Sequence, residues 1–187
     1  MADMAKLGEQ AAQVLDFWLV QTPPEKRFAQ DDALDAHIAQ EFGPLHSQLS
    51  QDVPPHWKAD GSSVLAAIIV LDQFSRNIYR DSGLAYAQDD AALALTRLAL
   101  GKGMDAEMSS DERQFLYMPF MHSERLDEVT YSIELMQQAN LDTAEDYARR
   151  HAEVIARFGR YPSRNAALGR STTREEAAFL ADHPLGF

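Results

Sequence analysis

The sequence contains no cysteine among its 187 residues. This absence excludes thiolate nucleophiles, cysteine-ligated zinc and iron–sulfur clusters, although it does not decide the cellular compartment. The Walker A loop, the GxSxG elbow, the GxGxxG turn after a strand and the HExxH zinc motif are missing too. We therefore expect no nucleophilic catalysis, no bound metal and no cofactor.

Long hydrophobic runs are also missing. The longest aliphatic run, residues 64–71, is far below the roughly 18 to 20 residues of a membrane span. The first thirteen residues lack the apolar core of a secretory signal. We expect a cytoplasmic protein without a membrane partner.

Positive charge is scarce and unevenly distributed. The net charge of −12 argues against nucleic acids and anionic membranes as partners. Residues 157–174, however, carry five arginines and no acid. Arginine suits planar pairing with carboxylate or phosphate. This stretch therefore needs either acids from elsewhere in the chain, for which Asp72 and Glu124 are our candidates, or an external anion.

The apolar pattern repeats at helical spacing, and no strand alternation accompanies it. Gly43-Pro44 is expected to break or kink the second predicted helix, and Pro119 to end the fifth. Ser109 with Glu112, and Thr172 with Glu175, form candidate capping boxes. We predict one all-α domain, residues 1–187, built of antiparallel helical hairpins. The predicted helices cover residues 7–22, 31–42, 62–79, 86–100, 109–119, 124–138, 142–158 and 172–181.

The third predicted helix changes character along its length. It is apolar on every side over residues 64–71 and then continues with polar residues. Asp72 and Arg76 are four apart, acid first, which favours an ion pair. Gln73 and Asn77 are a second, uncharged pair at the same spacing. One interpretation is a polar clamp that fixes helix packing, because buried polar groups are usually satisfied structure. The other is a ligand pocket.

His122, Ser123 and Glu124 follow Pro119 at the start of the sixth predicted helix. In the structural interpretation, Ser123 is the N-cap and Glu124 complements the helix dipole. In the functional one, His122 and Glu124 are candidate catalytic acid–base residues. A metal would need a third ligand, such as His151, and no ligand spacing supports one.

Taken together, these motifs resemble a known bacterial family, the domain of unknown function 924. The resemblance covers residues 14–180 and implies a fold like that of tetratricopeptide-repeat proteins, a right-handed superhelix of about eight helices. It implies no activity. This chain departs from the family pattern at Arg27-Phe28, where Trp-Phe is usual, and at Val129, where Gln is common. The resemblance rests on residues 17–18, 71–77, 117–119, 122–124, 151, 158–165, 168–170 and 173–176.

Three functions remain open at this point. The first is a binding module for a small anion or a peptide terminus. The second is a hydrolase- or isomerase-type enzyme that uses His122 or Glu124 with arginines stabilising negative charge. The third is a purely structural ion-pair network, with a protein-interaction surface elsewhere. The sequence does not decide the oligomeric state. The predicted ligand-binding residues are Asp72, Gln73, Arg76, Asn77, His151, Arg160, Arg164 and Asn165.

Overall fold

The computed structural model describes residues 2–183, with side chains from residue 8 onward. The side chain of Leu7, at which the first predicted helix begins, therefore lies outside the described side chains. Over these residues the chain is helical and contains no strand, which confirms the all-α prediction. The chain forms two compact units, one of residues 1–80 and 84–119 and the other of residues 81–83 and 120–187. The superhelix and the single domain stay predictions.

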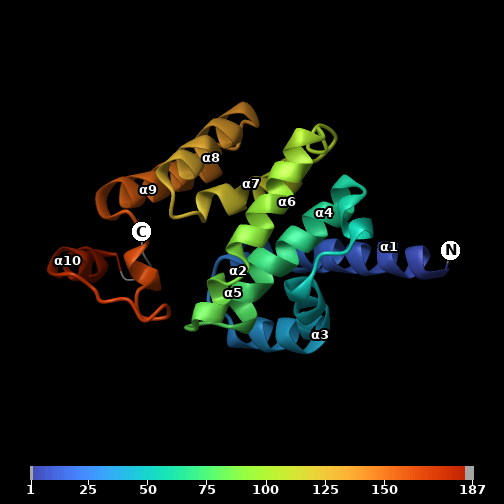
Figure 1. Ribbon diagram of the computed structural model, residues 1–187, viewed down its shortest axis with the longest axis horizontal. Coiled ribbons are helices and arrows are strands. Elements are labelled where there is room, and N and C mark those ends of the chain that lie inside the picture. The colour runs from blue at the N-terminus through green and yellow to red at the C-terminus, as the bar shows by residue number, and fades with distance from the viewer. Residues whose placement is uncertain (1, 184–187) are drawn as a thin grey trace. The chain divides into compact units, whose positions relative to one another are not determined.

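The first unit contains helices α1 to α6 and most of α7 (Figure 1). Two of its segments, η1 and η3, are π-helical, and η2 and η4 are short 3-10 turns. Their bounds are α1 Ala2–Leu15, η1 Asp16–Gln21, α2 Pro24–Arg27, α3 Asp32–Gln51, η2 Pro55–Lys58, α4 Gly61–Ile68, η3 Ile69–Phe74, α5 Ser75–Ile78, η4 Gly83–Tyr86, α6 Asp89–Gly101 and α7 Ser110–Met121.

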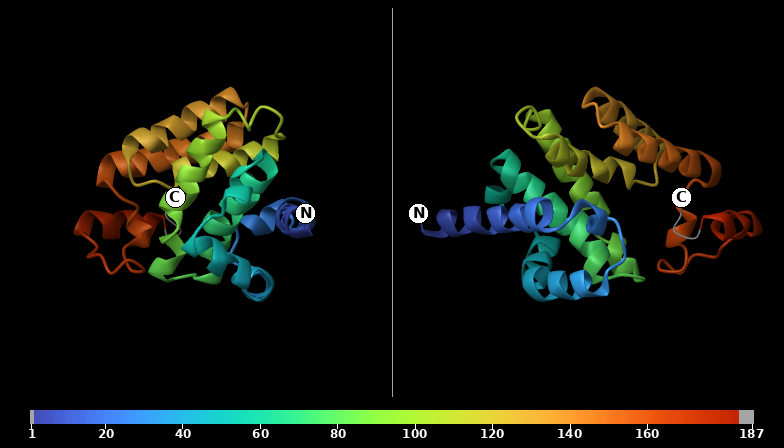
Figure 2. Two further views of the ribbon diagram at one scale, coloured as in Figure 1. Left: turned by 45° about the vertical axis from the view of Figure 1, so that its right-hand side comes forward. Right: turned by 180° about the vertical axis from the view of Figure 1, so that it is seen from behind.

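The centre of this unit is the continuous rod formed by α4, η3 and α5. Every residue from 64 to 75 is buried, as the apolar run predicted. The rod is covered by α1, α3 and α6, all of which contact it (Figure 2). Within η3 the π-helical turn inserts an extra residue, a feature that often occurs at functional sites. Asp72 and Gln73 lie in this turn.

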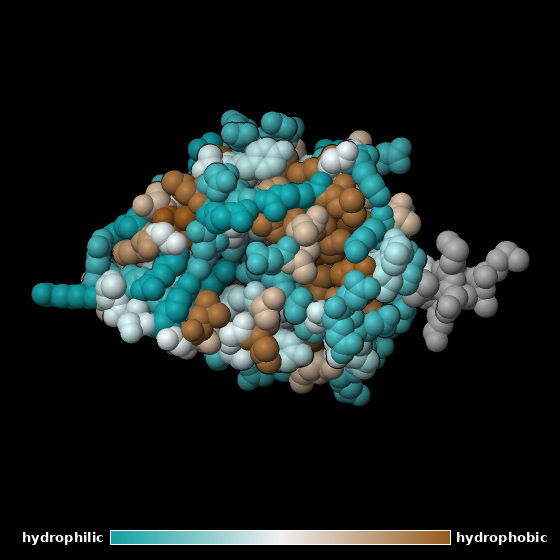
Figure 3. Space-filling model, in the orientation of Figure 1, coloured by the Kyte–Doolittle hydropathy of each residue, from teal (hydrophilic) through white to brown (hydrophobic). Residues whose placement is uncertain are grey.

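An aromatic cluster joins the rod to η1 and α3. The ring of Phe74 lies 5.4 Å from Trp18, 6.1 Å from Phe17 and 4.9 Å from Phe42 between ring centroids. The contacts with Trp18 and Phe17 are edge-to-face, an arrangement that stabilises beyond the apolar area that it buries. The Phe17-Trp18 motif therefore contributes to the core. Over α4 and α6, apolar residues also reach the surface (Figure 3).

Both internal prolines are tolerated within helices. α3 continues through Pro44 to Gln51, and it changes direction sharply along its length, as Figures 1 and 2 show. The predicted kink is therefore present, without a break. The prediction that Pro119 ends its helix is wrong, because α7 runs on to Met121. Pro119 stands in the last turn of α7.

Arg27, one of the two departures from the family pattern, is the last residue of α2, and its side chain is buried against the end of η1. Its guanidinium donates to the carbonyls of Leu19, at 2.7 Å, and Thr22, at 3.1 Å. These carbonyls lie where the helix ends and would otherwise lack donors. Arg27 therefore has a structural role. The other departure, Val129, is fully buried in the apolar core of the second unit.

The second unit is built on the hairpin of α8 (Leu126–Gln138) and α9 (Asp142–Phe158). Its core contains Val129, Val154, Ile155 and Tyr161, with Phe158 and Phe179 packed against it. α9 has the predicted bounds, and it ends at Gly159, whose φ of 68° suits glycine. A 3-10 turn, η5 (Pro162–Arg164), and α10 (Arg174–Asp182) complete the unit.

Two predicted helix N-caps are wrong. α8 begins at Leu126 rather than at residue 124, so Ser123 is not its N-cap and Glu124 lies in the connection before it. The capping box of α10 is Thr173 with Glu176, one residue later than predicted. Ser109 and Glu112, in contrast, form the expected box before α7, with Glu112 accepting the Ser109 N–H at 2.8 Å.

A buried histidine fixes α3 to the rod. The Ser75 hydroxyl donates to the Leu71 carbonyl at 2.5 Å, so His46 Nε2–H donates to Ser75 Oγ, 2.7 Å away. His46 Nδ1 then accepts from Ser50 at 3.3 Å. Burial lowers the pKa of His46 from its ordinary value of 6.5, so the folded protein holds this ring neutral.

This histidine gives a pH prediction. The unfolded chain binds a proton at His46 more readily than the folded chain, so this contribution to stability is complete above pH 6.5 and is lost as the pH falls toward the folded pKa. We expect the unfolding free energy to fall between pH 7.5 and 5.5, and to fall less in His46→Gln. The measurement is urea denaturation at both pH values. The control variant is His183→Gln, which changes an exposed histidine. If His46→Gln shows the same pH dependence as wild type, the assignment is disproved.

Across the described helices, none combines the length and apolar character that crossing a membrane would require.

Candidate functional site

The first polar cluster surrounds Arg76 in the first unit. Its Nη1 lies 3.0 Å from Asp72 Oδ1, which confirms the predicted pair, and it also donates to the Asp72 carbonyl at 2.7 Å. Both terminal nitrogens bind Asp89 in a fork, at 3.0 and 3.2 Å. Burial alone would lower the pKa of Arg76, but Asp72 and Asp89 outweigh it and raise that pKa. The site holds a permanently charged guanidinium between two acids.

Gln73 and Asn77 bind other partners than each other. Gln73 donates to the Asp72 carboxylate and, at 3.3 Å, to Met118 Sδ. Asn77 donates to Asp35 at 2.7 Å. Arg80 binds the same carboxylate with two nitrogens, at 2.6 and 2.8 Å. Asp35 thus ties the N-terminal part of α3 to the end of the rod, which fits the polar-clamp interpretation.

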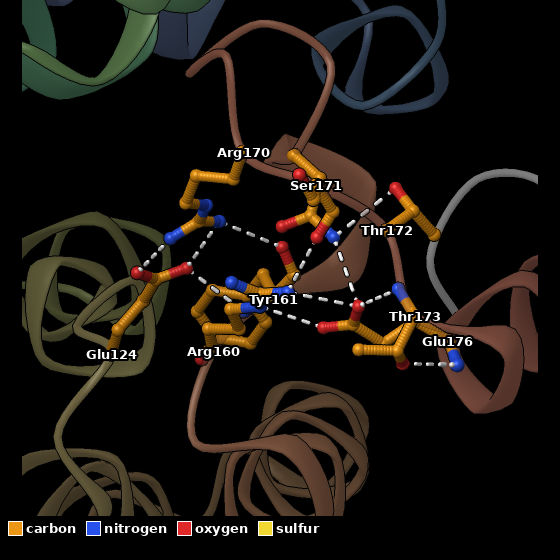
Figure 4. A network of polar contacts seen from close by, with 9 residues as sticks. Glu124, Arg160, Tyr161, Arg170, Ser171, Thr172, Thr173 and Glu176 are labelled. Atoms are coloured by element: carbon orange, nitrogen blue, oxygen red, sulfur yellow. Dashed lines mark hydrogen bonds and ion pairs between the residues drawn. The ribbon is translucent and has the colours of Figure 1, made fainter.

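The second polar cluster, in the second unit, begins at Glu124 (Figure 4). Its carboxylate receives the fork of Arg170, at 2.6 and 3.0 Å, and the backbone N–H of Tyr161, at 2.8 Å. Arg170 also donates to the Tyr161 carbonyl at 3.0 Å. Glu124 is therefore an internal partner of the arginine-rich stretch, as predicted. The predicted pairing of Asp72 with that stretch stays a prediction.

Glu176 is the second acid that this stretch uses. Arg160 forks onto both of its oxygens at 2.6 and 2.9 Å, and the Thr173 N–H donates at 2.7 Å. The amide of Asn165 lies 3.3 Å from the same carboxylate. Glu176 is only 2% exposed. The hydrogen bond from Arg160, followed by that from Thr173, lowers the pKa of Glu176 to about 2.

A third ion pair, which is exposed, joins the arginine-rich stretch to α10. Arg157 lies 2.9 Å from Glu175, and their side chains are 53% and 63% exposed. Neither Glu175 nor Glu176 was identified from the sequence as a partner. The capping-box pattern is a sequence signal that could have identified Glu176, but the box was predicted one residue too early, at Thr172 and Glu175.

Arg164 lies in a group of rings. Its guanidinium stands 4.6 Å from the centre of the Tyr161 ring and donates to the His122 carbonyl at 2.9 Å. The His151 ring lies 5.5 Å from Tyr161 and 6.4 Å from His122, between centroids. His151 Nδ1–H donates to the Tyr147 carbonyl at 2.7 Å, which fixes the orientation of the ring. Two imidazoles and one guanidinium therefore share one neighbourhood, which we call the Arg164 group.

The chemistry of Glu124 does not suit a general base. Burial would raise its pKa, but the hydrogen bonds from Arg170 and Tyr161 outweigh burial and lower it. A carboxylate stabilised in its ionised form has little tendency to take a proton at neutral pH. Over the part of the chain that the structure describes, no three His, Asp or Glu side chains are placed to hold a metal ion.

The predicted ligand-binding residues divide between the two units. Asp72, Gln73, Arg76 and Asn77 belong to the first. The remaining members belong to the second, where Arg160 and Asn165 meet at Glu176, and His151 and Arg164 meet at Tyr161. His122 adjoins this second group, and Glu124 binds Arg170 beside it.

The described residues form an all-helical protein whose polar clusters are organised around carboxylates. Each of these carboxylates accepts hydrogen bonds from arginine side chains or backbone N–H groups. The chain belongs to the family described as "Bacterial protein of unknown function (DUF924)", whose model matches residues 14–183. Among solved structures, it is similar to the protein of unknown function ATU0120 from Agrobacterium tumefaciens. The two are 34% identical, the match covers 94% of this chain and 98% of that one, and the TM-score is 0.88. No curated protein matches the chain.

Proposed function

We propose that this protein is a binding module for a small anion, a carboxylate or a phosphate, held by the Arg164 group. The observation that carries the proposal is that Arg164 and His151 both contact the Tyr161 ring, while the His122 ring lies 6.4 Å from that of His151. A guanidinium and imidazoles are the donors with which proteins bind carboxylate and phosphate. Arg164 is 9% exposed, and limited exposure to water strengthens hydrogen bonds to an anion.

The proposed anion site includes fewer arginines than the set predicted from the sequence. Arg157, Arg160 and Arg170 each bind a glutamate within the second unit. For these three, the structural interpretation of the arginine-rich stretch accounts for their charge. The binding proposal concentrates on Arg164 and the two histidines because Arg164 and His151 both contact the Tyr161 ring, beside which the His122 ring lies against His151. A cytoplasmic location belongs to this proposal as well.

A thermal-shift screen tests the proposal. Wild type and Arg164→Lys are melted with inorganic phosphate, citrate or N-acetylglycine, and with sodium chloride at equal ionic strength. A ligand at a hundred times its Kd stabilises by about 2.7 kcal/mol, so we expect a rise of roughly 5 to 10 °C in wild type. Arg164→Lys keeps the charge but loses the planar fork, and we expect it to lose most of the shift.

The matched control is Arg157→Lys, the same substitution at an exposed arginine. It should keep the full shift. Equal shifts in Arg164→Lys and wild type would place the anion elsewhere. No shift with any anion, together with a much lower melting point in Arg164→Lys, would mean that Arg164 holds the fold together.

A further inference from the structure

The C-terminal helix α10 is held to the second unit by few contacts. It has nine residues, and Glu176 is its one buried side chain. Phe179 adds a partly buried ring, 5.3 Å from Phe158 between centroids, and Glu175 adds the exposed pair with Arg157. An isolated helix of this length is marginal in water, so tertiary contacts decide whether it forms. Docking of α10 therefore depends chiefly on the Glu176 carboxylate.

The surroundings of that carboxylate are those that a free carboxylate would need. Arg160 Nε binds Oε1 at 2.6 Å and Nη2 binds Oε2 at 2.9 Å, the planar fork that gives carboxylates their strongest recognition. Asn165 Nδ2 lies 3.3 Å from Oε2. Arg160 and Asn165 both come from the chain before α10, so this half of the site does not depend on the helix that fills it.

Asn165 provides an independent indication of a ligand. The residue is 1% exposed, and its Oδ1 is buried without a hydrogen-bond partner among the described residues. Buried amide oxygens are nearly always paired. This acceptor belongs to the same amide whose Nδ2 faces Glu176. A carboxylate that carries an O–H or N–H donor beside it would use both ends of the amide, which Glu176 does not.

We propose that the Glu176 carboxylate is an internal ligand in a carboxylate-binding site formed by Arg160 and Asn165, and that α10 is a latch which an external carboxylate displaces. The ligand class is a carboxylate with an adjacent hydrogen-bond donor. A 2-hydroxy acid supplies an O–H, and the C-terminal residue of a peptide supplies an N–H. This site uses different residues from the Arg164 group and does not depend on the function proposed above.

Chemical rescue of Glu176→Ala tests the site. This variant removes the internal carboxylate and leaves Arg160 and Asn165 in place. It is melted with sodium glycolate, N-acetylglycine or acetate, and with sodium chloride at equal ionic strength. At ten times the Kd of a carboxylate we expect the melting point to rise by about 3 to 6 °C. Glycolate or N-acetylglycine should exceed acetate, which lacks the donor, and the larger of the two identifies the ligand source.

The control is Glu175→Ala, which removes the neighbouring exposed acid, and we expect no rescue in it. If Glu176→Ala is unfolded in chloride, the readout is recovery of the folded state in carboxylate. Equal melting points in chloride and in all three carboxylates would overturn the proposal.

Hydrogen exchange of the wild-type protein tests the latch. We expect glycolate or N-acetylglycine, relative to chloride, to speed amide exchange in residues 174–182 while α8 and α9 keep their protection. Arg164→Lys should show the same effect, which separates this site from the Arg164 group. Exchange of α10 that changes only together with α8 and α9 would mean that the helix is no latch.

Discussion

Replacing Arg76 by alanine is expected to lower the free energy of unfolding by about 3 to 5 kcal/mol, the usual cost of removing one partner from a buried ion pair. Asp72, whose side chain is 1% exposed, loses the guanidinium at 3.0 Å. Asp89 loses both bonds of its fork. For a chain of this size the melting point should fall by roughly 6 to 20 °C, which urea denaturation and a thermal scan would both measure.

Arg149→Ala is the matched control for this experiment. Arg149 forms an i,i+4 pair with Glu145, acid first as in Asp72 and Arg76, but its side chain is 51% exposed. Exposed pairs of this spacing contribute about 0.3 to 0.5 kcal/mol. A similar small loss in Arg76→Ala would show that the buried cluster is not a clamp. Arg76→Lys should fall between the two, because lysine keeps the charge without the fork.

Replacing Glu176 by glutamine is expected to remove stabilisation on the order of 3 kcal/mol at neutral pH, since a pKa lowered from 4.5 to about 2 corresponds to that amount. Glutamine resembles the protonated acid in shape, so the variant isolates the charge. The fork from Arg160 and the N–H of Thr173 remain, now facing a neutral amide.

The pH dependence of this difference follows from the direction of the pKa change. The ionised form of Glu176 stabilises the folded state fully above pH 4.5, and the stabilisation is lost as the pH falls toward 2. Wild type and Glu176→Gln should therefore converge in stability as the solution is acidified. Glu124 and other acids titrate in both proteins and cancel in the comparison. A difference that stays constant from pH 7 to pH 3 would contradict the assignment.

Local sequence patterns determined most helices of this protein. The bounds of α9 follow from its apolar spacing and from Gly159, and the rod of α4, η3 and α5 follows from a run that is apolar on every side. The Asp72–Arg76 pair was also readable, since both residues belong to one helix. Information within about four residues is enough for such features, because the helix itself sets the geometry.

Features that depend on packing were misread or missed. Pro119 stays helical, and the last capping box is formed by Thr173 and Glu176, one residue later than predicted. The frame Thr172 with Glu175 has the same residue types, so pattern alone did not separate the two. The structure selects Glu176 because it is the acid that turns inward to Arg160, while Glu175 stays exposed with Arg157.

The partners of the site residues show the same limit. Asp35 reaches Asn77 and Arg80 from more than forty residues away, and Glu124 reaches Arg170 from a comparable separation. Arginine and acid residues are common on helix surfaces, and only the packing of the helices decides which of them meet. The sequence by itself thus determined the helices, the buried rod and the family, because these depend on short-range periodicity and on motif identity. Only the tertiary structure decided which carboxylate each arginine binds, because an ion pair forms where the fold brings two charges within a few ångströms and shields them from water.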